Sequence, residues 1–167
     1  MTRIKVLCIG NSLVADDAFG PKIFEHFTSG ELDDNIIFRM LGVGGLDLLS
    51  EFDGEDLVVV VDAVNTGNTP GTLKVVPWQK IERVSGSPVT SHDIGLDEVI
   101  RVGRLLHPER MPGEVIFVGV EGKDFKSVGH PLSPEVKQAF PLAVEALRNL
   151  LHSRKDVGTA PGRQHSG

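Results

Sequence analysis

Three short polar segments hold the residues in this sequence that are best suited to chemistry. Asp16 and Asp17 follow a glycine-containing turn. Asp62 comes directly after an apolar run, and His92 lies in a Ser-His-Asp sequence. Two carboxylates and one imidazole, with coordination positions left open, can bind a divalent transition metal. A carboxylate could also serve as a general base.

Each of these segments follows a predicted strand. Strands are predicted from apolar, β-branched runs at 4–9, 35–41, 56–61, 72–76 and 114–120. Helices are predicted between and after them from apolar spacing and capping residues, at 20–30, 46–52, 91–106 and 133–151. This alternation predicts an α/β fold, with an open, twisted, mostly parallel sheet of about five strands and helices on both faces.

Each candidate residue also has an ordinary structural explanation. Asp16 or Asp17 could cap the first helix, and Asp62 could cap a turn. His92 could be an exposed residue in the first turn of a helix that Ser91 caps. The argument for a site is convergence, because loops at the carboxyl ends of parallel strands meet at one edge of the sheet. His130, in the loop before the last helix, is expected at the same edge.

Composition limits the possible classes of protein. The 167 residues fit one domain, expected at 1–152, followed by a polar and mobile tail at 153–167. Cys8 is the only cysteine, which fits a reducing cytoplasm. The net charge of −6 argues against a nucleic-acid partner. No apolar stretch approaches the roughly 20 residues of a membrane span, and we expect no membrane association.

Several common motifs are missing from the sequence. The turn after Gly10 does not continue as GxGxxG, and the acidic Asp16 and Asp17 would repel a phosphate. There is also no GxSxG nucleophile turn and no HExxH helix. Dinucleotide binding and serine-hydrolase or zincin chemistry are therefore poorly supported.

Four blocks, in order over about residues 3 to 150, resemble the hydrogenase maturation endopeptidase family. The first is IGNSLVADDAFGPKIFE, similar to the family pattern G-N-x-L-x-x-D-[DE]-x-x-G. The second is VVVVDAVNTGNTPGTLKVV, and the third is SHDIGL. The fourth is GEVIFVGVEGKDF followed by PLSPEV. Members of that family remove a C-terminal extension from the nickel-loaded precursor of the hydrogenase large subunit.

The resemblance implies roles for particular residues. Asp17, Asp62 and His92 match the family's metal-recognition residues. The nickel would be supplied by the precursor, the expected protein partner, instead of being held permanently. We expect a cytoplasmic monomer. One position departs from the family, because Met40 or Leu41 stands where many members have an acidic residue. A catalytic role for that acid is in doubt here, and the change could mark a subgroup that acts on another type of hydrogenase.

The sequence leaves the mechanism and two other functions open. Nickel could polarise the carbonyl or a water molecule, or Asp16 or another acid, with Asp17 and Asp62 as candidates, could activate water. The same residues could instead belong to a non-proteolytic nickel-binding module, or to a small-molecule hydrolase with a resident metal. A nucleotide-binding domain is a third, weaker alternative.

Overall fold

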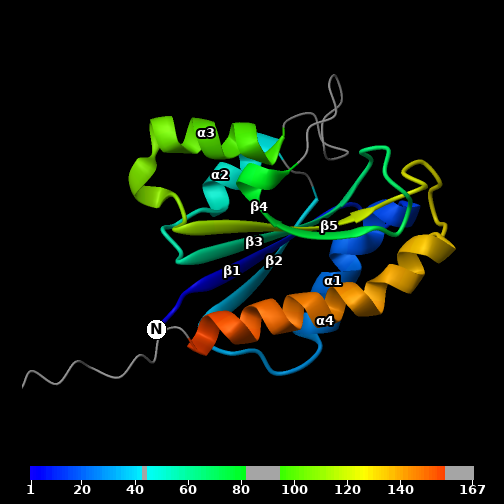
Figure 1. The fold of residues 1–167 in the computed structure, drawn as a ribbon, viewed down its shortest axis with the longest axis horizontal. Helices are drawn as coiled ribbons and strands as arrows, with labels where there is room; N and C mark the ends of the chain where they lie inside the picture. Colours follow the sequence, from blue (N-terminus) through cyan, green and yellow to red (C-terminus); the bar gives the residue numbers. More distant parts are fainter. Residues whose placement is uncertain (43–44, 82–94, 157–167) are drawn as a thin grey trace, which may run out of the picture.

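A five-stranded sheet forms the centre of the described part of the molecule (Figure 1). The computed structural model describes residues 1–42, 45–81 and 95–156. The strands are β1 (Ile4–Ile9), β2 (Ile36–Leu41), β3 (Leu57–Val64), β4 (Leu73–Pro77) and β5 (Glu114–Glu121). Their order is β2-β1-β3-β5-β4; β4 is antiparallel to β5, and the other neighbours are parallel. The predicted mostly parallel sheet is confirmed.

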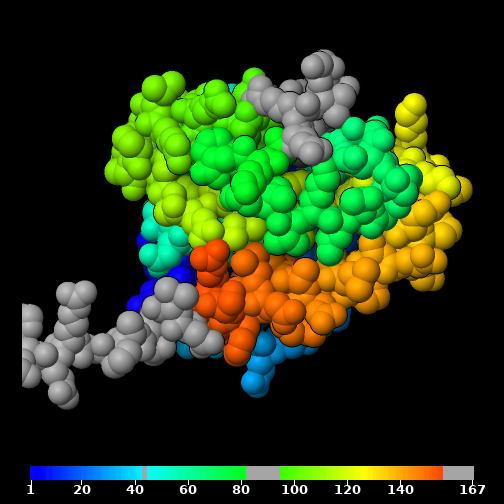
Figure 2. All heavy atoms as spheres, in the orientation of Figure 1, coloured from blue at the N-terminus to red at the C-terminus, as the bar shows by residue number. Residues whose placement is uncertain are grey.

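Burial of the strands follows their sequences. All eight residues of β3 are buried, as expected for a β-branched run in the middle of a parallel sheet. β4 lies at an edge and has no buried residue. Figure 2 shows the chain around β4 at the surface between α3 and α4.

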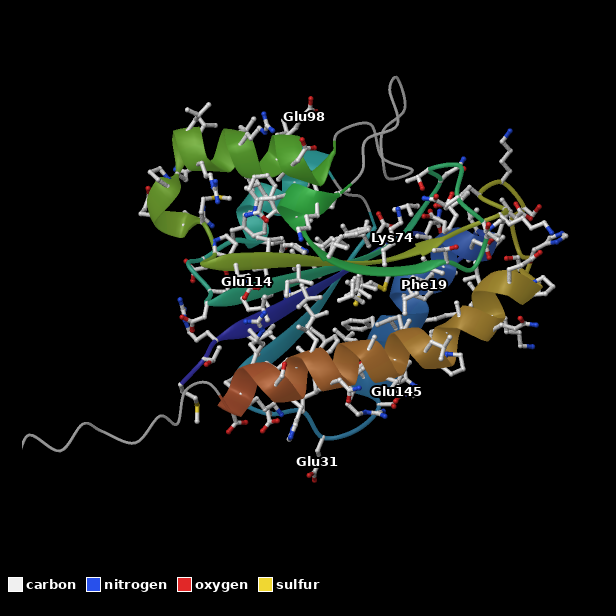
Figure 3. The ribbon with its side chains drawn as sticks, in the orientation of Figure 1. Phe19, Glu31, Lys74, Glu98, Glu114 and Glu145 are labelled. Carbon is white, nitrogen blue, oxygen red and sulfur yellow. The ribbon has the colours of Figure 1, made fainter. Side chains whose placement is uncertain are left out.

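Helices cover both faces of the sheet (Figure 1). One apolar core lies under α1 (Phe19–Thr28) and α4 (Pro134–Asp156). The other lies under α2 (Leu48–Glu51) and α3 (Leu96–Leu106). In Figure 3 Phe19 lies between the sheet and α4, where its ring meets Phe140 edge-on at 6.2 Å. None of the described helices is long and apolar enough to cross a membrane.

Three predicted boundaries differ from the structure. β3 continues past Asp62 to Val64, because its ladder with β5 extends to Val64 opposite Glu121. α3 begins at Leu96, with Gly95 in an extended conformation at its N-cap position, whereas the predicted start at Ser91 lies outside the described residues. α4 continues to Asp156, so the predicted tail begins with helical residues; 157–167 lie outside the described part.

The far end of α4 is fixed by ion pairs. Arg154 donates to the Glu114 carboxylate at 2.9 Å, which ties the helix to the first residue of β5; Glu114 is labelled in Figure 3. Lys155 pairs with Asp33 in the segment before β2. The helix that covers one core is therefore held at the amino edge of the sheet, away from the loops that follow β1, β3 and β5.

Candidate functional site

Asp62 is a buried carboxylate in the central strand. It has no exposed surface, and its neighbour across the ladder is Gly119 of β5. Neither carboxylate oxygen has a hydrogen-bond partner among the described residues. Burial raises the pKa of Asp62 well above its usual value, and the nearby charge of Asp17 raises it further. The backbone N–H of Ala63 acts in the opposite direction and lowers this pKa. Its position does not meet the geometry of a hydrogen bond to the Asp62 carboxylate. The oxygens are therefore desolvated and still able to accept a ligand.

Asp17 lies in the short 3-10 turn Ala15–Ala18 that leads into α1. The Asn11 N–H donates to its carboxylate at 3.2 Å and to its main-chain oxygen at 3.1 Å. Gly10 permits this closed turn because its φ is +146°, and because a Cβ at this position would lie 2.0 Å from the main-chain oxygen of Asp17. The turn thus fixes Asp17 close enough to Asp62 for its charge to act on that carboxyl.

Asp16 is also fully buried, but both of its oxygens accept hydrogen bonds. The N–H groups of Lys123 and Asp124 donate to Oδ2 at 2.7 and 2.9 Å, and that of Ser133 donates to Oδ1 at 2.7 Å. A carboxylate that holds three backbone donors is a poor candidate for abstracting a proton from water. The structure therefore argues against the predicted role of Asp16 as a general base.

The alternative explanation of Asp16 or Asp17 as a cap of the first helix is wrong. α1 has Ala18 at its N-cap position, and no side chain caps it. The backbone N–H groups of the preceding turn are also occupied: Gly10 donates to the Leu41 oxygen at 3.1 Å, and Leu13 donates to Asn11 Oδ1 at 2.9 Å. Because these donors already have acceptors within the protein, the turn is poorly suited to cradle a nucleotide phosphate.

Sequence reasoning missed Glu121, the last residue of β5. It is buried, and its Oε1 accepts the N–H groups of Thr66 and Gly67 at 2.7 and 3.0 Å. Its Oε2 accepts the Thr66 hydroxyl at 2.7 Å. Glu121 therefore holds the loop that follows β3. The same signal that singled out Asp62, an acid at the end of an apolar run, could have found it.

The structure places two of the three predicted metal ligands near each other. The charge of Asp17 raises the pKa of Asp62. His92 lies outside the described residues, and the described part contains no cluster of three metal-ligating side chains. His130 is exposed, and its charge acts on Asp124. Met40 is 45% exposed on the edge strand β2. The position at which many members of the resembling family have an acidic residue therefore carries no carboxylate here.

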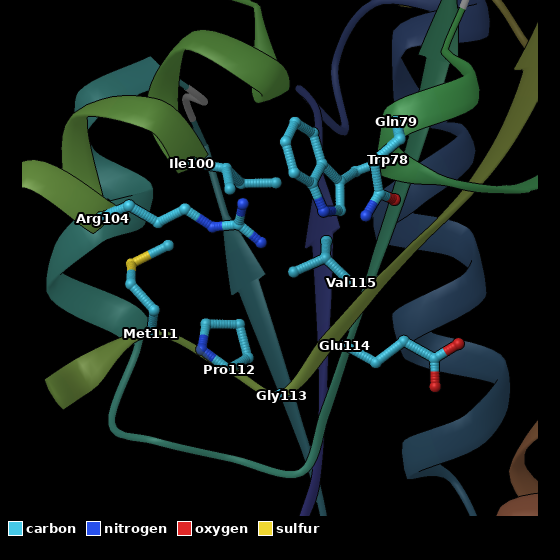
Figure 4. A pocket seen from close by; sticks show the side chains of 9 residues that line it. All are labelled: Trp78, Gln79, Ile100, Arg104, Met111, Pro112, Gly113, Glu114 and Val115. Carbon is cyan, nitrogen blue, oxygen red and sulfur yellow. The ribbon is translucent and has the colours of Figure 1, made fainter. Parts of the chain in front are cut away.

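A small cavity of about 70 Å³ lies elsewhere, at the amino edge of the sheet (Figure 4). It is bordered by the start of β5 at Glu114, and by α3 at Arg104. The Arg104 guanidinium lies 5.0 Å from the centre of the Trp78 ring. Sites in open α/β sheets form at the opposite edge, so we interpret this cavity as a packing feature and not as the functional site.

The sheet is mostly parallel, and two buried acids that interact electrostatically, Asp17 and Asp62, lie where its strands end. This arrangement is typical of α/β enzymes. Residues 22–150 match the family model described as hydrogenase maturation protease. The chain belongs to this family, whose members are endopeptidases and therefore hydrolases. The predicted resemblance is confirmed.

Individual relatives agree with this assignment. The chain is 34% identical to the hydrogenase expression/formation protein HupD of Rhizobium leguminosarum over 155 residues, which is 90% of this chain and 75% of the relative. Among solved structures, the hydrogenase maturating endopeptidase HybD of E. coli is similar, with a TM-score of 0.78 and 26% identity. That match covers 92% of this chain and 94% of the other.

Proposed function

We propose that this protein is the endopeptidase that removes the C-terminal extension of a nickel-loaded hydrogenase large-subunit precursor. Asp17, Asp62 and His92 would contact the nickel that the precursor carries. Membership of the maturation protease family supports the reaction. The observation that supports the metal contact is the buried Asp62 carboxylate, whose oxygens have no partner among the described residues.

The electrostatics of the two acids favour a cation. Two carboxylates in a buried region repel each other, which is one cause of the raised pKa of Asp62. A divalent ion between them would remove this repulsion and satisfy the Asp62 oxygens. Carboxylate oxygens and an imidazole nitrogen are suitable donors for nickel. Because the ion must displace the proton that Asp62 holds, its binding would release a proton.

This arrangement would make nickel a checkpoint for cleavage. In a nickel-free precursor, no positive charge would offset the repulsion between Asp17 and the buried Asp62 on docking. In a loaded precursor, the ion would bring the adjacent chain to the two carboxylates. A water oxygen would then add to the scissile carbonyl, the peptide C–N bond would break, and the leaving nitrogen would take a proton.

The residues suggest how the proton could move. Asp17 is held by the Asn11 N–H and could orient or deprotonate the water. Once Asp62 has released its proton to bind the ion, the proton for the leaving nitrogen would come from this water by way of Asp17. Nickel would add Lewis-acid polarisation of the carbonyl or of the water. The three bonds of Asp16 leave it as a residue that positions its neighbours.

Two alternatives make different predictions. A non-proteolytic nickel-binding module would bind the loaded precursor without shortening it. A small-molecule hydrolase would act without any protein partner and would retain its metal through purification. We further propose that the protein is a cytoplasmic monomer.

Mass spectrometry of the hydrogenase large subunit in cells that lack this protein would test the proposal. We expect the C-terminal extension to be retained, and to be removed when the wild-type chain is restored. Asp62→Asn should fail to restore cleavage, whereas Asp53→Asn, an exposed acid at the amino edge, should succeed. A fully processed subunit in the deleted strain would rule out the proposed function.

A further inference from the structure

Two backbone segments beside Asp17 form a small ledge, defined here as residues 13–16 and 124–129. Val14 and Val128 form an antiparallel bridge. The Gly129 N–H donates to the Leu13 oxygen at 2.7 Å, and the Ala15 N–H donates to the Ser127 oxygen at 3.2 Å. The ledge therefore joins the turn that carries Asp17 to the loop that follows β5.

Asp16 holds the ledge in place. Its carboxylate accepts the N–H groups of Lys123 and Asp124 on one side and that of Ser133, at the start of α4, on the other. Asp124 shapes the turn further, since its Oδ1 accepts the N–H groups of Lys126 and Ser127, both at 3.0 Å. A buried carboxylate and an Asx-type turn thus fix this surface loop.

The fixed ledge presents two large apolar side chains to solvent. Leu13 is 65% exposed and Val128 is 71% exposed, one from each segment. The Leu13 N–H is bonded to the Asn11 side chain, and Asn11 is bonded to Asp17. Leu13 is therefore linked to Asp17, a proposed nickel contact, by two hydrogen bonds through Asn11.

We propose that the ledge is a docking surface for the hydrogenase large-subunit precursor, with Leu13 and Val128 contacting an apolar area next to the cleaved extension. This inference rests on the proposed function. A partner whose metal reaches the buried Asp17 and Asp62 must cover the surface around them, and the ledge is continuous with Asp17. Covering exposed apolar side chains favours association, and a backbone that is already ordered loses little entropy on binding.

The direct test is the double variant Leu13→Ser/Val128→Ser, assayed on nickel-loaded precursor. We expect kcat/KM to fall by about tenfold or more, through a higher KM, with the melting temperature unchanged because both side chains are exposed. The control is Leu105→Ser, which is 83% exposed on α3. It should leave both constants unchanged.

The possible results separate this inference from the proposed function. If the wild-type chain fails to cleave the loaded precursor, the proposed function is wrong. If the wild-type chain cleaves and the double variant has an unchanged KM, the ledge does not dock the precursor. A lower kcat with unchanged KM would also overturn docking, because it would place these side chains in the chemical step.

Hydrogen exchange tests the role of Asp16 separately. In Asp16→Asn, an amide NH₂ group replaces one of the two oxygens, so either the amides of Lys123 and Asp124 or that of Ser133 should exchange at least tenfold faster than in the wild type. The amides of Thr66 and Gly67, held by Glu121, should not change. Unchanged exchange at 123, 124 and 133 would show that Asp16 does not hold the ledge.

Discussion

Asp16 and Asp62 are both fully buried acids near the same edge of the sheet, yet their surroundings are opposite. Asp16 accepts three backbone hydrogen bonds, whereas Asp62 has no partner among the described residues. A buried carboxylate without partners is costly. Asp16 therefore has a structural explanation within the fold, and Asp62 needs an explanation outside it, which a metal carried by the substrate would supply.

Glu121 resembles Asp16 because its carboxylate oxygens also have hydrogen-bond partners. It accepts the backbone N–H groups of two residues and one hydroxyl, and it fixes the loop after β3. All three acids are buried, but only Asp16 and Glu121 have hydrogen-bond partners, and these two hold loops. Asp62, which has no partner among the described residues, is the acid that we expect to act on the substrate. Substitutions at Asp16 and Asp62 should accordingly affect different properties of the protein.

The largest expected effect is on activity at Asp62. Asp62→Asn keeps the shape of the side chain but removes its negative charge and its ability to exchange a proton. We expect kcat/KM on nickel-loaded precursor to fall by about 10²–10⁴-fold, measured by mass spectrometry of the released extension. Activity within threefold of the wild type would show that cleavage does not depend on the Asp62 carboxylate.

The next effect is on stability at Asp16. Asp16→Ala leaves three backbone N–H groups without their acceptor, so we expect the free energy of unfolding to fall by roughly 2–5 kcal/mol. Urea denaturation followed by circular dichroism would measure it. Asp53→Ala, at an exposed position, provides the control and should change stability by less than about 0.5 kcal/mol. A loss at Asp16 as small as that of the control would refute its structural role.

A smaller change in the free energy of unfolding, this time a gain in stability, is expected when Asp62 is substituted. A raised pKa means that the folded state binds this proton more tightly than the unfolded chain does. The carboxyl therefore stabilises the fold below its unfolded pKa, and this contribution is lost as pH rises toward the folded pKa. Asp62→Asn avoids the loss and should stabilise the protein by about 1–2 kcal/mol at pH 7.5.

Urea denaturation of this variant at several pH values gives the test. The gain from Asp62→Asn should shrink steadily as the pH is lowered toward 4.5. A gain that does not depend on pH would mean that the pKa of Asp62 is not raised in the folded protein.

The smallest effect concerns Cys8, which is buried in β1. Burial raises the pKa of its thiol to about 12, so iodoacetamide at pH 8 should not label the folded protein within an hour. The same reagent should label the unfolded chain in urea completely. Rapid labelling of the folded protein would show that the β1 core opens readily.

Much of the fold could be predicted from the sequence because its signals are local. The DLVVVV run specified the central strand, and Ser133-Pro134-Glu135 marked the start of α4. The end of β3 could not be predicted, because pairing with β5, more than 50 residues away, extends that strand to Val64. The start of α3 was placed too early, since Ser91 and Asp93 resemble capping residues, whereas the helix begins after Gly95.

The site was predictable only to the level of candidates. Strand ends pointed to Asp16, Asp17 and Asp62 together, and the family pattern chose Asp17 over Asp16. The separate roles of the two neighbouring acids depend on Lys123, Asp124 and Ser133, which lie more than 100 residues further along the chain. No local pattern reveals such partners. The role of His92 remains a prediction.

The central claim is that Asp17, Asp62 and His92 recognise nickel carried by the precursor. The most direct measurement is cleavage of purified nickel-loaded and nickel-free precursor by the wild-type protein, followed by intact-mass spectrometry. The account predicts release of the C-terminal extension from the loaded precursor and none from the nickel-free precursor over the same period. Cleavage of both precursors at equal rates would contradict it.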